Sequence, residues 1–475
     1  MTKASHRNTT FDELTVGQTA RIERTVTAND LYVFAHASGN TNPIHMPGKD
    51  VDEDGTVDTV APSLWVGSLI SSVLGTLLPG AGTLYRGQTF RFLGRAKLGD
   101  RLVVSVRCME KRERPVALFE TRVERTDGTL LLEGVAEVET PTATIILKDH
   151  QLPMLLVDEH DHFGVLVARC KRLPAMPIAV VCPDDENSLG GALLSRREGL
   201  IAPFFVGARD NILKAAEAAA MDVSDIIIID IADHSEAAAR AVAMVNAKEV
   251  RAVMKGNVHS DELLAQVVKK EGGLRTSRRI SHVFVMDVPT KSNLLFISDA
   301  AINIAPDLTT KVDIVQNAIE LALACGLECP KVGVLAAVET VNVNMPSTLD
   351  AAALAKMADR GQIRGGVVDG PLAMDNAVDM QAARTKGISS LVAGQADVLI
   401  VPNLEAGNML AKELTFVARA EAAGLVVGAK APVILTSRAD NDKARLASCA
   451  LAQLYDHWRQ HGEPLKDSGL SEAAE

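Results

Sequence analysis

The sequence has few aromatic residues. Phe, Trp and Tyr make up 3% of its 475 residues, with two Trp and three Tyr. Proteins that bind nucleic acids usually carry a basic surface and aromatic side chains that stack on bases, whereas this chain has a formal net charge of −11. Both features argue against a nucleic-acid partner. The apolar mass must come from Ala, Val, Leu and Ile, which is typical of buried parallel strands covered by Ala-rich helices.

The sequence also has little to suggest export or a membrane. Its first residues contain no apolar run of the kind that secretory signals need. The stretch from Thr59 to Tyr85 is uncharged, but its prolines, glycines and hydroxyl residues make a buried helix the better interpretation. The six cysteines are scattered without a CxxC pair, which indicates reduced and mostly buried thiols. We therefore expect a cytoplasmic protein with no membrane partner.

Short motifs for common nucleotide or hydrolase sites are absent. GxxxxGK[ST], GxGxxG and GxSxG do not occur, so triphosphate hydrolysis, a Rossmann site and an ordinary serine hydrolase lose support. No His, Cys or carboxylate set has zinc-like spacing, and the charged run 158–162 is expected to be solvated. The acidic segment 50–55 opens like an EF-hand loop, but Ala61 stands where a bidentate Glu should be. We expect no metal site.

Up to about residue 140 the pattern is that of an α+β domain. The runs 101–112, 116–126 and 129–139 alternate apolar and polar residues, and Asp127-Gly128 predicts a hairpin between the last two. This is typical of an antiparallel sheet with one face in water. Residues 62–78 precede it as a single apolar helix, long enough to be wrapped by the sheet.

After Pro177 the pattern changes to that of an α/β domain. Short apolar runs without alternation are separated by Ala-rich helical stretches, which predicts strands buried on both faces of a parallel sheet. These runs cover 178–182, 226–231, 282–288, 294–298, 332–336, 397–401 and 433–436.

A polar turn in the first half carries the first candidate site. Gly39 is expected to end a short helix, after which Asn40, Asn42 and His45 follow within a turn stiffened by Pro43. An imidazole fixed beside amides suits the positioning of water or a carbonyl. Local chemistry alone favours the simpler interpretation, a structural turn with a hydrogen-bonded His.

This segment, with the helix after it, resembles the MaoC-type, R-specific enoyl-CoA hydratases over about residues 10–140. The resemblance implies a hot-dog fold and a catalytic Asp–His pair, in which His45 matches the His. Asn40 stands where the family usually has Asp, and an amide cannot take up a proton. Either His45 acts alone, or the domain binds an acyl-CoA without hydrating it efficiently. We expect hydratase activity to be weak or lost.

In the second half, polar residues follow predicted strands at the edge where α/β sheets bind ligands. Lys255, Gly256 and His259 come after the strand 250–254 and open a helix that can seat an anion. Arg275 adds a local positive charge. Such residues also occur in solvated helix ends and plain connections.

Three further loops have the same position. Gly370, Asn403 and Asn408 belong to glycine-bearing loops after strands, and each is weak evidence alone. Ser437-Arg438 ends the last strong strand, where a hydroxyl beside a guanidinium suits an oxyanion or a phosphate. A helix N-cap Ser beside a surface Arg fits this segment equally well.

Taken together, the segments resemble the phosphate acetyl/butyryltransferase family from about residue 175 to 460. The matching text includes MKGNVHS, GLRTSRRISHVFVMDVP, SDAAINIAPDL, VVDGPLAMDNAV, VPNLEAGNML and VGAKAPVILTSRAD, and its wording leans toward the butyryl branch. The resemblance implies a fold like that of the isocitrate/isopropylmalate dehydrogenases, with a cleft between two subdomains. It implies the reaction of acyl-CoA and phosphate to acyl-phosphate and CoA, both as substrates, with no permanently bound cofactor.

The resemblance also implies residue roles. Ser437 would hydrogen-bond the tetrahedral intermediate or the departing thiolate, and Arg438 would bind phosphate and the carbonyl oxygen. Related acetyl enzymes carry an Asp seven residues after that Ser for the thiol proton, where this chain has Ala444. Asp440 and Asp442 are the nearest carboxylates, and the identity of the base is open. The other candidate residues are expected to bind CoA or phosphate. They are Lys255, Gly256, His259, Arg275, Gly370, Asn403 and Asn408.

We therefore predict a fusion of two acyl-CoA domains. Residues 1–140 form the hot-dog domain, 141–175 a linker and 176–475 the transferase, with subdomains at 176–277 with 425–475 and at 278–424. The resemblance to both families also implies that the chain forms a homo-oligomer. The alternative is an acyl-CoA-binding scaffold or sensor with degenerate catalysis in both domains, which Asn40 and Ala444 favour. The acyl chain, acetyl or butyryl, stays open.

Overall fold

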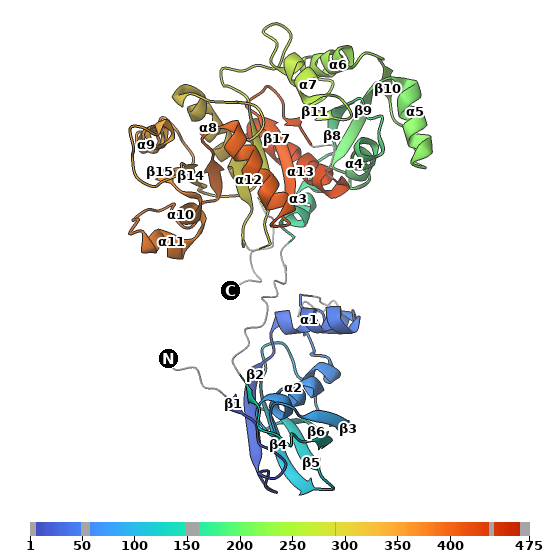
Figure 1. Cartoon of the computed structure of the whole chain (residues 1–475). Helices are drawn as coiled ribbons and strands as arrows, with labels where there is room; N and C mark the ends of the chain where they lie inside the picture. Colours follow the sequence, from blue (N-terminus) through green and yellow to red (C-terminus); the bar gives the residue numbers. More distant parts are fainter. Residues whose placement is uncertain (1–5, 49–57, 148–160, 290, 437–440, 466–475) are drawn as a thin grey trace. The chain divides into compact units, whose positions relative to one another are not determined.

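Figure 1 shows the computed structural model of the chain, which describes residues 6–48, 58–147, 161–289, 291–436 and 441–465. The chain divides into two compact units, Met1–Val157 and Asp158–Glu475, each with its own main sheet. Ser437, Arg438 and the acidic segment 50–55 lie outside the described residues.

The first unit contains a five-stranded antiparallel sheet wrapped on a long helix. Its elements are β1 (His6–Arg7), β2 (Thr19–Thr25), α1 (Ala28–Ser38), η1 (Pro43–His45), α2 (Ser63–Thr76), β3 (Leu84–Phe92), β4 (Arg101–Lys111), β5 (Val116–Arg125), β6 (Leu130–Glu139) and β7 (Ile146–Leu147). The sheet order is β2-β4-β5-β6-β3, and β1 pairs with β7.

The sequence pattern explains this sheet. Alternation along β4 puts Leu102, Val104 and Val106 on the buried face, where they join one hydrophobic cluster with Ile70 of α2. Gly128, at φ +89°, turns the chain between β5 and β6. The predicted antiparallel sheet, hairpin and buried helix are confirmed.

The second unit contains one eleven-stranded sheet with helices on both faces. Its strands are β8 (Met176–Val181), β9 (Ile201–Gly207), β10 (Ile228–Asp230), β11 (Ala252–Lys255), β12 (Ser281–Asp287), β13 (Leu295–Ser298), β14 (Lys331–Leu335), β15 (Val367–Leu372), β16 (Val398–Ile400), β17 (Glu421–Val427) and β18 (Val433–Ile434). Its helices are α3 (His162–Cys170), α4 (Glu186–Arg197), α5 (Arg209–Ala218), α6 (His234–Asn246), α7 (Ser260–Val267), α8 (Leu308–Ala324), α9 (Pro346–Asp359), α10 (Met374–Val378), α11 (Met380–Thr385), α12 (Leu404–Phe416) and α13 (Asp442–His461).

The expectation of a parallel sheet is correct for the two flanks and wrong for the centre. The order is β10-β9-β8-β11-β18-β17-β12-β13-β16-β14-β15. The pairs from β10 to β18 and from β13 to β15 are parallel, whereas β18-β17, β17-β12 and β12-β13 are antiparallel. The links from β12 to β13 and from β17 to β18 are too short for a crossover helix, so these strands pair as hairpins.

Other departures from the sequence pattern have local reasons. β9, β15 and β17 contain Pro, Gly or several Ala, which dilute the apolar runs that predict strands. The expected linker 141–175 holds α3, whose Phe163 and Leu166 join the core of the second unit. His162, expected to be solvated, bonds to the Asp287 carboxylate through Nδ1 at 2.8 Å.

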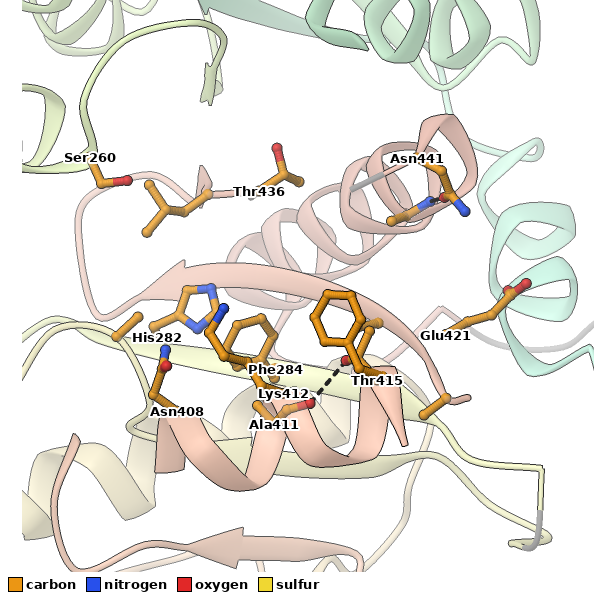
Figure 2. A pocket seen from close by; sticks show the side chains of 16 residues that line it. Ser260, His282, Phe284, Asn408, Ala411, Lys412, Thr415, Glu421, Thr436 and Asn441 are labelled. Atoms are coloured by element: carbon orange, nitrogen blue, oxygen red, sulfur yellow. Dashed lines mark hydrogen bonds between the residues drawn. The ribbon is translucent and has the colours of Figure 1, made fainter. Parts of the chain in front are cut away.

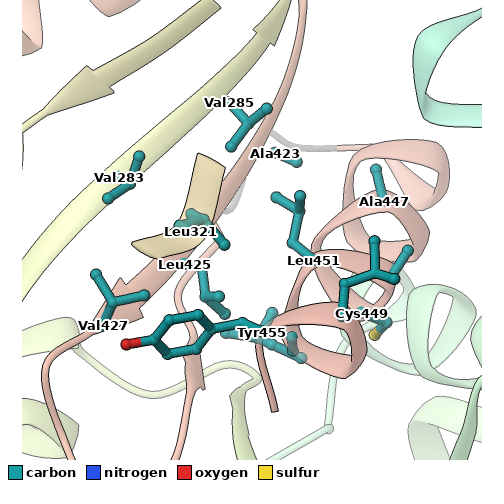
Figure 3. Close-up of a cluster of buried hydrophobic side chains, with 14 of the residues drawn as sticks. Val283, Val285, Leu321, Ala423, Leu425, Val427, Ala447, Cys449, Leu451 and Tyr455 are labelled. Carbon is teal, nitrogen blue, oxygen red and sulfur yellow. The ribbon is translucent and has the colours of Figure 1, made fainter. Parts of the chain in front are cut away.

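Helix α13 covers the antiparallel centre of the sheet. Figure 3 shows Val283 and Val285 of β12 and Leu425 of β17 packed with Leu451 and other side chains of α13. Fully burying a side chain such as Leu451 contributes about 2 kcal/mol. Of the six cysteines, all but Cys329 are buried and all are free thiols. Within the described ranges, no helix is long and apolar enough to cross a membrane.

Candidate active site

A cavity of about 440 Å³ opens in the second unit, beside the end of β18. It lies between α12 and β12 on one side and the segments around Thr436 and Asn441 on the other (Figure 2). Its described lining residues are Ser260, His282, Phe284, Ala301, Asn408, Ala411, Lys412, Thr415, Phe416, Ala420, Glu421, Ala422, Leu435, Thr436, Asn441 and Ala444. The wall is apolar over much of its area, with a few polar groups that can orient a ligand.

Two residues frame the segment 437–440 from either side. The Thr436 hydroxyl accepts a hydrogen bond from Nη1 of Arg445 at 2.8 Å, and Arg445 is 3% exposed. Asn441 caps α13, because its Oδ1 accepts from the Ala444 amide at 2.9 Å. The N-terminus of α13 therefore opens onto the cavity, an arrangement that favours anions.

Charge is sparse in the cavity wall. Glu421 lies 3.7 Å from Nζ of Lys443, and its side chain is 48% exposed. Lys412 projects from α12 and forms no ion pair with any residue of the described ranges. A cation without a partner can bind a phosphate group of a ligand.

His282 is the most deeply buried polar group of the wall. It is 1% exposed, and its backbone N–H donates to Oδ1 of Asp299 at 3.2 Å. The ring of Phe284 packs against the imidazole edge to face, with the two ring centroids 4.4 Å apart. Burial lowers the pKa of the imidazole, against opposing effects of the Asp299 carboxylate and the Leu435 carbonyl. The ring is therefore neutral at pH 7.

Asn408 is the one cofactor-binding residue expected from sequence that lines the cavity. Its Nδ2 donates to the Ala300 carbonyl at 3.3 Å. It lies inside α12 rather than in a loop, and Asn403 caps that helix by accepting from the Ala406 amide at 2.9 Å. The expected loop is wrong because the N-cap starts the helix directly after the strand.

Lys255, Gly256 and His259 precede the lining residue Ser260 in the sequence, but none of the three lines the cavity itself. Lys255 is 5% exposed, and its Nζ donates to the Gly256 carbonyl at 3.4 Å. A Cβ at Gly256 would lie 2.4 Å from the Val181 carbonyl oxygen, so this position requires glycine. His259 precedes α7 at its N-cap, and its neighbour Ser260 reaches the cavity.

Two expected residues lie elsewhere. Arg275 is exposed and is not among the lining residues. Gly370, expected in a loop, lies inside β15, where a Cβ would be 2.8 Å from the Val334 carbonyl oxygen. Close packing between β14 and β15 accounts for this glycine.

Sequence reasoning missed His282, Phe284 and Lys412. In the sequence, His282 is the first residue of the apolar run 282–288, which predicts only a buried strand. A titratable residue at the start of an otherwise apolar strand was the available signal, since buried polar groups are usually hydrogen-bonded or functional.

In the first unit, the polar turn is built by its own amides. Oδ1 of Asn40 accepts from the Asn42 amide at 3.2 Å, and Oδ1 of Asn42 accepts from the Ile44 amide at 3.4 Å. Nδ1 of His45 lies 2.7 Å from the Val60 carbonyl, which must accept its proton and so leaves the lone pair on Nε2. Within the described ranges no hydrogen bond joins Asn40 to His45.

Comparisons with known proteins found a family match for each of the two units. Residues 229–453 match the family model for phosphate acetyl/butaryl transferase, and residues 13–129 match the model for the MaoC like domain. A phosphate acetyltransferase of Rhizobium meliloti is 55% identical over 291 residues, which cover 61% of this chain and 92% of that protein. A phosphate butyryltransferase of Clostridium beijerinckii is 43% identical over 293 residues, covering 62% and 97%. The crystal structure of a branched-chain phosphotransacylase from Enterococcus faecalis matches with a TM-score of 0.52 and 29% identity, covering 59% of this chain and 99% of that one.

Proposed function

The chain belongs to the phosphate acetyl/butyryltransferase family, and we propose that its second unit converts acyl-CoA and phosphate into acyl-phosphate and CoA, and back. The 55% identity to a phosphate acetyltransferase over 92% of that protein carries the proposal. The cavity lined by Thr436 and Asn441, the described residues on either side of 437–440, supports it. Acyl-CoA and phosphate are the substrates, and no resident cofactor is needed.

The chemistry defines what the site must supply. An oxygen of phosphate attacks the thioester carbonyl carbon, the carbonyl oxygen becomes an oxyanion, and the C–S bond then breaks to release a thiolate that takes up a proton. A cation must hold the phosphate, and a donor must stabilise the oxyanion. We assign Arg438 to the phosphate and carbonyl oxygen and Ser437 to the intermediate or thiolate.

The CoA moiety needs contacts of its own. Asn408 and Lys412 line the cavity and are proposed to bind it, Lys412 through a phosphate group. Lys255 and Arg275 remain proposals for phosphate binding, as do His259, Gly256, Gly370 and Asn403 for CoA.

A single assay tests the function. The purified chain is incubated with acetyl-CoA or butyryl-CoA, with and without inorganic phosphate, and free thiol is followed. We expect thiol release only with phosphate, and acyl-phosphate as the second product. Thiol release that does not depend on phosphate would refute the proposal. CoA binding without any turnover would instead favour the scaffold or sensor alternative.

For the first unit we propose acyl-CoA binding with weak or no hydration. The match to the MaoC like domain supports the ligand class, and Asn40 in place of an acid supports the loss of activity. Hydration of crotonyl-CoA by the wild-type chain is the measurement. A rate usual for R-specific hydratases would refute the loss.

We also propose the finer organisation implied by the family. The two parallel flanks of the large sheet support subdomains at 176–277 with 425–475 and at 278–424, in the manner of the isocitrate/isopropylmalate dehydrogenases. A cytoplasmic homo-oligomer without nucleic-acid or membrane partners completes the proposal. Sedimentation of the purified chain tests the oligomer.

A further inference from the structure

Part of the cavity wall is the uncovered side of a hydrophobic core. Phe284 of β12 and Ala422 of β17 are partly buried and pack against a hydrophobic cluster that contains Ile297. Leu410 and Leu414 of α12 pack against the same cluster. Phe284 and Ala422 also line the cavity, so an apolar surface faces the space between α12 and the sheet. A ligand with a short apolar chain would complete the packing there.

Small side chains leave space in this part of the wall. Phe284 pairs with Gly424 in the sheet, and Ala422 lies two residues before Gly424 on the same face of β17. At these two positions β17 therefore presents a single methyl group. On the helix side, Ala411 also lines the cavity with one methyl group, on the same side as Phe284 (Figure 2). We call Phe284, Ala411, Ala422 and the buried Leu435 the apolar section of the cavity.

Three polar residues that line the cavity do not obstruct an apolar chain. The Thr415 hydroxyl donates to the Ala411 carbonyl of its own helix at 2.9 Å, so it needs no partner from a ligand (Figure 2). Lys412 and Glu421 are exposed and keep their charges in water. A chain of methylene groups can therefore enter the apolar section without burying these polar groups unpaired.

The proposed reaction decides which end of an acyl-CoA belongs in the apolar section. Leu435 and Thr436 line the cavity at the end of β18, and Thr436 directly precedes Ser437, which we assign to the intermediate. A Cβ at Gly424 would lie 3.0 Å from the Leu435 carbonyl oxygen, so the end of β18 adjoins the face of β17 in the apolar section. The acyl chain is bonded directly to the reacting carbonyl. The phosphate groups of CoA lie many bonds away, where the exposed Lys412 suits them.

Building on the proposed function, we propose that the apolar section binds the acyl chain and that Ala411 and Ala422 determine the chain length. The cavity of about 440 Å³ has the size of sites that hold drug-sized ligands, so its volume does not restrict the chain to acetyl. Each methylene group moved from water into apolar surroundings raises affinity by about fourfold. The two additional methylene groups of butyryl therefore favour it over acetyl by about 15-fold.

Filling the apolar section tests this role in the phosphate-dependent thiol assay. In Ala422→Leu we expect kcat/KM to fall by about 10- to 100-fold for butyryl-CoA but by less than about threefold for acetyl-CoA, because the added side chain occupies the space of the outer methylene groups. Ala411→Leu, on the helix side, should shift the ratio of the two substrates in the same direction. Ala418→Leu, at an exposed position outside the cavity wall, should keep the wild-type ratio.

Retained turnover of acetyl-CoA distinguishes a blocked acyl chain from a variant that has not folded. Two results would overturn the proposal. One is a wild-type kcat/KM for butyryl-CoA that does not exceed that for acetyl-CoA. The other is an unchanged ratio of the two substrates in both Ala411→Leu and Ala422→Leu.

A binding measurement separates this inference from the proposed function. S-butyl-CoA and S-ethyl-CoA are thioethers that cannot transfer an acyl group, so calorimetry gives their affinities without turnover. S-butyl-CoA should bind the wild-type chain about 15-fold more tightly than S-ethyl-CoA, and the difference should vanish in Ala422→Leu but persist in Ala418→Leu. The first unit, also proposed to bind acyl-CoA, has the same sequence in all three proteins, so the change belongs to the second unit.

Identical binding of S-butyl-CoA to the wild-type chain and to Ala422→Leu would overturn the role of the apolar section. An affinity difference that is lost in Ala422→Leu, in a chain without phosphate-dependent turnover, would refute the transferase proposal and leave acyl-chain binding in this section standing.

Discussion

Asn40 and His45 illustrate how single atoms decide the chemistry of the first unit. An amide at position 40 holds the turn by accepting from the Asn42 amide, and a carboxylate would make the same bond. Only the carboxylate can also carry a proton. The hydrogen bond of the turn is therefore compatible with either residue, and the proposed loss of hydration concerns the proton alone.

We expect Asn40→Asp to raise crotonyl-CoA hydration by about 10²-fold or more, because the substitution restores an acid–base group. Asn42→Asp is the matched control, since it adds a carboxylate to the same turn and preserves the bond to the Ile44 amide. Hydration is followed by the absorbance of the enoyl thioester. An equal gain in both variants would show that added charge, rather than position 40, is responsible.

The Ser437–Arg438 pair is tested at the same scale. Ser437→Ala and Arg438→Ala should each lower phosphate-dependent thiol release by about 10²- to 10³-fold, because each removes a group that stabilises developing charge. Arg240→Ala, which removes an exposed Arg paired with Glu249 3.0 Å away, should leave the rate unchanged. Variants of the pair that retain wild-type turnover would contradict the assignment.

At the scale of elements, local patterns predict strands and helices better than they predict pairing. The hairpin at Asp127-Gly128 follows from two residues, and helices α5 and α6 follow from Ala-rich runs. The pairing of β12 with β17 in the antiparallel centre did not follow, because these two strands lie far apart in the sequence. The position of Gly370 inside β15 also did not follow from the local pattern.

A glycine at the end of β11 tests how tightly the strands are packed. Gly256→Ala should lower the free energy of unfolding of the second unit by about 3 kcal/mol or more, because its Cβ would lie 2.4 Å from the Val181 carbonyl. Gly75→Ala, in helix α2 with open space around its Cβ, should be neutral or slightly stabilising. Denaturant titration gives both values. A loss below about 0.5 kcal/mol at Gly256 would mean that the strands shift freely.

At the scale of the whole molecule, each unit has its own hydrophobic core. Leu132 belongs to the cluster of the first unit, and Leu451 to a cluster of the second. Each unit should thus be able to lose stability without the other, which makes the stability of the first unit and the proposed turnover of the second separable by mutation.

We expect Leu132→Ala to destabilise the first unit by about 2–5 kcal/mol, because it leaves a cavity in the core, while phosphate-dependent turnover stays at the wild-type rate. Leu451→Ala should do the reverse, lowering the thermal transition of the second unit and its turnover at elevated temperature. Calorimetry and the thiol assay measure both effects. Loss of turnover in Leu132→Ala at a temperature where the second unit is folded would indicate that the units depend on each other.

The sequence by itself determined the division into two units, the family that each resembles, the character of the antiparallel sheet's faces and the presence of Asn40. These are read from periodicity, from turn residues and from motifs that lie together in the chain. Only the tertiary structure decided which residues share the cavity: Ser260, His282, Asn408 and Thr436 come from four separate segments. One of the few aromatic residues, Phe284, lies in this cavity and packs against the ring of His282. The physical reason is that strand and helix packing brings these segments together from distant parts of the sequence, and no local pattern records that arrangement.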